Sequence, residues 1–177
     1  MTVSVHDVAA RLVELQLDQY GKGEGLAVMS SSKLHKLSYL CQAYHLAWHG
    51  EPLFAEEICA ANSGPVVMEL FPYQEGGHSI ESWPVGDAGK LSKAQNATVR
   101  ALFDFHSYDS GLQLGRWTST HIPWLRAREK MANPDDRQVI SRDDMGAYYR
   151  ALMDAPSTPK EYAARFMDRY TELGVKL

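Results

Sequence analysis

The sequence has few cysteines, no long apolar run and no excess of positive charge, and each absence excludes a class of protein. Two cysteines, Cys41 and Cys59, in 177 residues cannot build the disulfide framework of a small secreted domain. No stretch approaches the roughly 20 consecutive apolar residues that a membrane-spanning helix requires, so we expect no membrane partner. The formal net charge of -4 at pH 7 argues against a dominant phosphate-binding face, and we therefore do not expect nucleic acid as a partner.

The start of the chain lacks the continuous apolar core of a secretory signal, because charged residues interrupt it. Ser4 and Asp7 instead predict the capped start of an amphipathic helix that contains Arg11 and Glu14 and ends near Tyr20. With neither a signal nor a disulfide framework, the expected compartment is the cytoplasm, where thiols stay reduced.

Motifs that hold common cofactors are also missing. The sequence has no Walker lysine motif, no dinucleotide-binding glycine fingerprint and no cysteine pairs at zinc-binding spacing. We therefore expect no cofactor. Nothing in the sequence indicates an oligomeric state.

Apolar residues recur at three- and four-residue spacing between residues 30 and 48, which predicts a helix at the centre of the fold. The apolar stripe consists of Leu34, Leu37, Cys41, Tyr44 and Trp48. Ser30 can cap the start of this helix, and Gly50 suits its end. Lys33 and Lys36 lie away from the stripe, so we expect them to face solvent, where they could also contact an acidic partner.

Gly64 and Pro65 predict a sharp corner after this helix. Gly64 permits a positive φ angle, which we expect there. Pro65 suits the first turn of a new helix, where its missing N–H costs nothing. The corner should therefore lead into a short helix that carries Val67 and Leu70.

The rest of the chain alternates polar turns with further helices. Residues 74–89 read as a glycine-rich surface loop with a short strand near residues 80–83. Val139 and Ile140 could pair as a strand with Ile58. Helices are predicted to begin at Ser92, Leu112, Pro123, Ser141 and Ser157, the last of them ending at Gly174. The expected fold is mainly α, a compact single-domain helical bundle with at most a minor short β-sheet.

A few side chains could carry chemistry. His45 and His49 have the four-residue spacing of metal ligands on a helix, but no third ligand accompanies them, and we expect a polar helix edge rather than a metal site. His121 could serve as a base and Cys41 or Cys59 as a nucleophile. Because cysteine is usually buried, the core interpretation is preferred, and no catalytic residue is assigned.

Two segments of the chain resemble one known family. The first comprises Lys33-Leu34-x-Lys36-Leu37-x-Tyr39, Gly50-x-Pro52-Leu53-Phe54, Ala60 and Gly64-Pro65-Val66, and the second is Thr120-His121-x-Pro123-Trp124-x-x-Ala127-Arg128. Together and in this order they resemble the Panacea domain, the SocA-like antitoxin domain that is also called GepA-like in phage-associated proteins. The resemblance suggests a single domain over residues 1–177, with a family core at 29–132 between an N-terminal helix and connection (1–28) and C-terminal helices (133–177).

This resemblance implies a non-enzymatic antitoxin that neutralises a cognate toxin protein by direct binding. An alternative within the same class is an adaptor that delivers the toxin to an AAA+ protease. A different class, a hydrolase or transferase, would need His121 or His45 to meet a carboxylate or a thiol in a pocket. The matching motif residues are expected to be structural or partner-binding, with Lys33 and Lys36 as the expected partner contacts.

Overall fold

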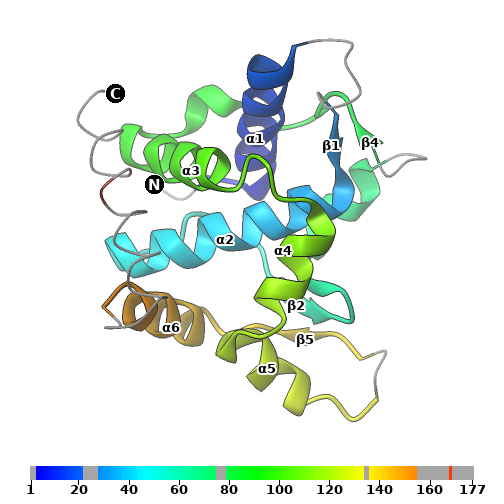
Figure 1. Cartoon of the computed structure of the whole chain (residues 1–177), viewed down its shortest axis with the longest axis vertical. Coiled ribbons are helices and arrows are strands. Elements are labelled where there is room, and N and C mark those ends of the chain that lie inside the picture. The colour runs from blue at the N-terminus through cyan, green and yellow to red at the C-terminus, as the bar shows by residue number, and fades with distance from the viewer. Residues whose placement is uncertain (1–2, 22–27, 75–78, 134–135, 155–167, 169–177) are drawn as a thin grey trace.

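Helix α2 (Ser31–His49) runs through the centre of the molecule, and the other elements surround it (Figure 1). The structure is a computed structural model that describes residues 3–21, 28–74, 79–133, 136–154 and 168. The remaining elements are α1 (Val5–Tyr20), β1 (Met29–Ser30), β2 (Ile58–Ala61), β3 (Gly64–Val67), the 3-10 helices η1 (Met68–Tyr73) and η2 (Ala88–Lys90), β4 (Ser79–Ile80), α3 (Lys93–Phe105), α4 (Gly111–Thr118), α5 (Ile122–Glu129), β5 (Gln138–Val139) and α6 (Arg142–Asp154). The mainly α fold class is confirmed. The helix predicted at residues 157–174 lies outside the described residues.

The predicted stripe and caps of α2 are confirmed. Leu37, Cys41 and Tyr44 are fully buried. The hydroxyl of Ser30 accepts a hydrogen bond from the backbone N–H of Lys33, and Gly50 ends the helix with a left-handed φ of 73°. The first helix, α1, also starts as predicted, with a capping box at its N-terminus.

The prediction that the α2 lysines face solvent is wrong. Lys33 is 7% exposed and Lys36 is 1% exposed. All residues of α2 from Lys33 to Ala47 are buried, because α3, α4, α6 and β3 pack around the helix. A helix enclosed in this way has no solvent face along most of its length, so its polar residues are buried with the apolar ones.

Besides one isolated bridge between Val3 and Phe54, the β-structure of the described residues consists of two small sheets. One has the antiparallel order β3-β2-β5 and the other pairs β1 with β4. The predicted strand pairing is confirmed, since Cys59 of β2 lies opposite Val139, and the N–H of Ile140 donates to the carbonyl of Ile58. Strand β4 overlaps the strand predicted near residues 80–83 only at Ile80.

The predicted helical start at Pro65 is wrong. Pro65 lies in β3, opposite Ala60, and the helical turn begins only at Met68. Since β3 is at the edge of its sheet, the missing N–H of Pro65 breaks no ladder within the sheet. Val67 therefore ends a strand, while Leu70 lies in η1 as predicted for the helix.

Helices α3 to α6 follow the predicted order. Ser92 and Ser110 each form a capping box at the start of α3 and α4. Ser141 accepts a hydrogen bond from the N–H of Asp144 at the start of α6. In Figure 1, α4 crosses one end of α2, and α6 runs alongside α2 on the side opposite α1 and α3.

Candidate functional site

The two family-like segments meet in space, although about 55 residues separate them along the chain. The indole Nε1 of Trp124, in α5, donates a hydrogen bond to the carbonyl oxygen of Ala61 at the end of β2. The β2–β3 turn also packs against α4, where Gly64 lies directly beside Gly115. This contact region, which we call the hairpin–α4 junction, joins the hairpin and helices α2, α4 and α5.

Two glycines make the hairpin–α4 junction possible. Gly64 has a φ of 103°, as predicted, and a Cβ there would lie 3.1 Å from the carbonyl oxygen of Gly115. A Cβ at Gly115 would lie 2.5 Å from the carbonyl oxygen of Ser63, closer than real Cβ contacts allow. The backbone of α4 therefore rests directly on the hairpin turn.

Lys36 lies beneath this junction. Its Cε is about as close to a Cβ at Gly64 (3.2 Å) as to one at Gly115 (3.3 Å). No hydrogen bond or ion pair joins its ammonium to another residue in the described part of the chain, and burial lowers its pKa to about 8. A buried ammonium without a counter-charge reduces the stability of the fold, so Lys36 is a costly structural residue rather than a surface contact.

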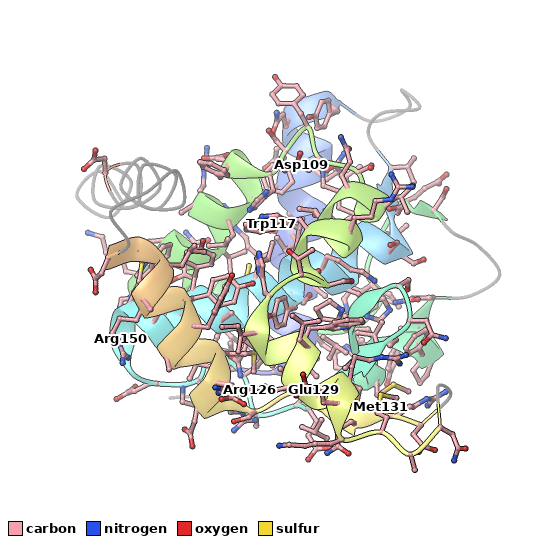
Figure 2. All side chains as sticks on the ribbon, turned by 60° about the horizontal axis from the view of Figure 1, so that its bottom comes forward. Asp109, Trp117, Arg126, Glu129, Met131 and Arg150 are labelled. Carbon is pink, nitrogen blue, oxygen red and sulfur yellow. The ribbon has the colours of Figure 1, made fainter. Side chains whose placement is uncertain are left out.

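Lys33 lies near the start of α4, where its ammonium has a hydrogen-bond acceptor. Its Nζ donates to the carbonyl oxygen of Ser107, and burial lowers its pKa while nearby Asp109 opposes that shift. Asp109 also lies 2.7 Å from Nδ1 of buried His106, and this hydrogen bond is the main reason that the pKa of Asp109 is lowered. Figure 2 labels Asp109 in the turn before α4 and Trp117 towards the end of that helix.

The His106–Asp109 pair was not identified from the sequence. Its only sequence signal is a three-residue spacing at the end of a helix, which many unrelated surface pairs share. A 250 Å³ hollow beside the pair is lined by Phe105, Gln113 and Trp117 in addition. No serine, threonine, cysteine or lysine lines this hollow.

The imidazoles predicted as candidate bases contact hydroxyls. Nδ1 of His121 lies 2.9 Å from the hydroxyl of Tyr149, which lies 3.4 Å from that of Tyr39. Nδ1 of His45 lies 2.9 Å from the hydroxyl of Thr98. Burial lowers the pKa of each imidazole to about 4. Within the described residues, neither imidazole contacts a carboxylate or a thiol, so the arrangement required for the hydrolase interpretation is not observed there.

The two thiols are buried, Cys41 completely and Cys59 at 6% exposure. Burial raises the pKa of both, which keeps them protonated and poorly nucleophilic. Among the residues that the structure describes, no group of three or more metal-ligating side chains fits a metal ion. The same residues include no helix long and apolar enough to cross a membrane.

Most of the motif residues are parts of the core. The buried ones, besides Lys33 and Lys36, are Leu34, Leu37, Tyr39, Leu53, Phe54, Gly64, Pro65, Val66, His121 and Pro123. Trp124 is half-buried, with the guanidinium of Arg128 lying 5.5 Å from the centre of its ring. Thr120 is exposed, and its hydroxyl donates to the carbonyl of Trp117.

Seven large apolar side chains are exposed in the described part of the chain, and four of them lie between residues 108 and 125. Tyr108 is 87% exposed, Leu112 62%, Ile122 46% and Leu125 40%. These four residues belong to the turn before α4, to α4 and to α5, and we call them the α4–α5 surface. The helices that carry them are brought forward in Figure 2.

The comparisons with known proteins identify one family. The family model described as "Antitoxin SocA-like, Panacea domain" matches residues 34–142, from α2 to the start of α6. No curated protein and no solved structure matches the chain. The matched range contains the whole hairpin–α4 junction and the α4–α5 surface. The chain therefore belongs to the family of SocA-like antitoxins with a Panacea domain.

Proposed function

We propose that this protein is the antitoxin of a toxin–antitoxin pair and neutralises its cognate toxin by direct binding, without catalysis. The observation that carries the proposal is the family match over residues 34–142. Neither His45 nor His121 contacts a carboxylate or a thiol in the described residues, so these two imidazoles give the hydrolase or transferase alternative no support. The proposed compartment is the cytoplasm.

The α4–α5 surface is the proposed toxin contact. Exposed aromatic and aliphatic side chains gain free energy when a partner covers them, and tyrosine is a frequent anchor of such interfaces. Tyr108 and Leu112 are the most exposed large apolar side chains in the described residues. Helix α4 packs on α2 and β3, and α5 packs on β2 and α6, so the core supports both helices of the surface.

Lys33 and Lys36 are not retained as toxin contacts, because both are buried under α4. Both lysines contribute to neutralisation only indirectly, by supporting the α4–α5 surface. Charge reversal at either position should therefore disrupt the fold rather than remove a contact, since it would bury a carboxylate beside backbone carbonyls.

The proposal can be tested by co-expression with the protein encoded by the adjoining reading frame. We expect that protein to arrest growth when produced alone and this chain to relieve the arrest and to co-purify with it. Leu112→Glu and Leu125→Glu should weaken co-purification at least tenfold and abolish rescue, because a charge would be buried at the contact. Val139→Glu, an exposed apolar position on β5, is the matched control and should rescue like the parent chain.

Circular dichroism must show that each variant is folded. Full rescue by folded Leu112→Glu and Leu125→Glu would remove the α4–α5 surface from the proposal, and failure of the parent chain to rescue or bind would contradict the proposed function itself.

The amount of toxin in the cell distinguishes neutralisation by occlusion from delivery of the toxin to a protease. Occlusion leaves the toxin level unchanged, whereas an adaptor lowers it in cells that contain the AAA+ protease.

A further inference from the structure

We propose that His45 and His49 form a binding site for a borderline divalent cation such as Zn²⁺, Ni²⁺ or Cu²⁺, separate from the α4–α5 surface. The two residues are one helical turn apart near the end of α2, and their ring centroids lie 4.4 Å apart. Both line a pocket of about 870 Å³ in the described part of the molecule. Imidazole nitrogens are the ligands that these cations prefer.

The hydrogen bonds around His45 determine which of its nitrogens can bind a cation. The hydroxyl of Thr98 donates to the carbonyl oxygen of Ala94 at 3.2 Å, so it accepts from Nδ1 of His45 at 2.9 Å. Nδ1 therefore carries the proton, and Nε2 keeps its lone pair. No hydrogen bond joins this Nε2 to any residue described by the structure.

This arrangement is typical of a metal-binding histidine. Such a residue commonly donates its second ring N–H to an oxygen, which fixes both the tautomer and the orientation of the ring. His45 is 5% exposed and held by Thr98, whereas His49 is exposed at the last turn of α2. The ring of His45 is thus oriented by Thr98, and the ring of His49 is accessible from solvent.

The pocket wall supplies further negative charge through Glu51, which follows His49 by two residues, and Asp7. Asp7 is already engaged, because it accepts the N–H groups of Ser4 and Asp87 and lies 3.9 Å from Nζ of Lys90. The protein thus provides two imidazole ligands, with water in the other coordination positions, and the bound cation should exchange readily. This inference revises the expectation from the sequence that the two histidines form only a polar helix edge.

Isothermal titration of the tag-free chain, first stripped of metal with a chelator, tests the site with Zn²⁺, Ni²⁺ and Cu²⁺ separately. We expect one cation per chain, and for Cu²⁺ an electron paramagnetic resonance spectrum with nitrogen hyperfine coupling. His49→Gln and His45→Gln should each abolish this one-to-one binding. Thr98→Val keeps both histidines but removes the hydrogen bond that fixes the tautomer of His45. This variant should bind the cation about tenfold more weakly.

His6→Gln is the matched control, because His6 is another imidazole beside a carboxylate, 3.8 Å from Glu69, outside this pocket. It should bind the cations as the parent chain does. Absence of one-to-one binding to the parent chain, or unchanged binding by both His49→Gln and His45→Gln, would overturn the proposal. Toxin rescue by folded His49→Gln should be normal, so failure of this site is distinguishable from failure of the antitoxin function.

Discussion

The indole of Trp124 donates a hydrogen bond of 3.2 Å to the carbonyl oxygen of Ala61, and this contact joins α5 to the β2–β3 hairpin. The donor lies in the second family segment and the acceptor directly precedes the Gly64 turn of the first. A half-buried carbonyl at the end of a strand is thereby satisfied by a side chain from a distant helix. The two segments are thus parts of one packed unit that holds the α4–α5 surface in place.

Replacement of Trp124 by phenylalanine tests this contact. Trp124→Phe keeps most of the ring but removes the N–H donor, so the free energy of unfolding should fall by about 1 kcal/mol. Urea denaturation followed by circular dichroism measures the change. Trp124→Ala also removes the packing of the ring and should cost more than Trp124→Phe. Equal losses in the two variants would show that the hydrogen bond, and not the ring, carries the effect.

Substitution of Gly64 should disturb the hairpin–α4 junction. A Cβ at this position is strained by the positive φ and meets the backbone of Gly115 at 3.1 Å, so Gly64→Ala should lower the free energy of unfolding by about 1 kcal/mol or more. Gly89→Ala is the control. Its added Cβ meets only the side chain of Asp87, and the change should stay within about 0.5 kcal/mol. A neutral Gly64→Ala would contradict the close contact with α4.

Replacement of Lys36 by methionine should stabilise the protein. The pKa of Lys36 is about 8 in the folded chain and 10.5 in the unfolded chain, so its charging opposes folding below pH 8. At pH 7, Lys36→Met should raise the free energy of unfolding by up to about 3 kcal/mol, because the methionine fills the same space without a charge.

The pH dependence provides a second measure of Lys36. The parent chain should gain stability as pH rises from 8 to 10.5, and Lys36→Met should lose that gain. Lys130→Met, at an exposed position, serves as control and should change stability by less than about 0.5 kcal/mol. A strongly destabilised Lys36→Met chain would show that the ammonium has a partner in the folded protein.

Acid should destabilise the fold through its buried imidazoles. Burial, and for His35 also the charge of Lys36, lowers the pKa of His35 and His121 from 6.5 to about 4. Protonation of His35 would also break the hydrogen bond that its Nδ1 accepts from the N–H of Val67. Because the folded pKa is the lower one, stability is complete above pH 6.5 and is lost as pH falls towards 4.

The expected loss is about 3 kcal/mol for each of the two imidazoles over this interval. Urea midpoints measured between pH 4 and pH 7 follow it, and His121→Gln should show a shallower pH dependence than the parent chain. Identical slopes for the two proteins would mean that His121 titrates normally in the folded state.

The local pattern of the sequence was sufficient to place α2 and its ends. The spacing of Leu37, Cys41 and Tyr44 predicts the helix and its buried stripe, and Ser30 and Gly50 predict its caps, because periodicity and capping depend on residues only a few positions apart. The positive φ of Gly64 was predictable for the same reason. The family resemblance likewise depends on short motifs that can be read without a structure.

Only the tertiary structure decided which polar residues of α2 are buried. Lys33 and Lys36 lie off the apolar stripe, yet α4 covers both, and α4 is more than 70 residues away in the sequence. Pro65 became a strand residue because residues 58–61 pair with it across a turn, an option that its local sequence does not reveal. A helical period shows where one apolar face must lie, whereas burial of the other faces depends on which distant elements pack against them.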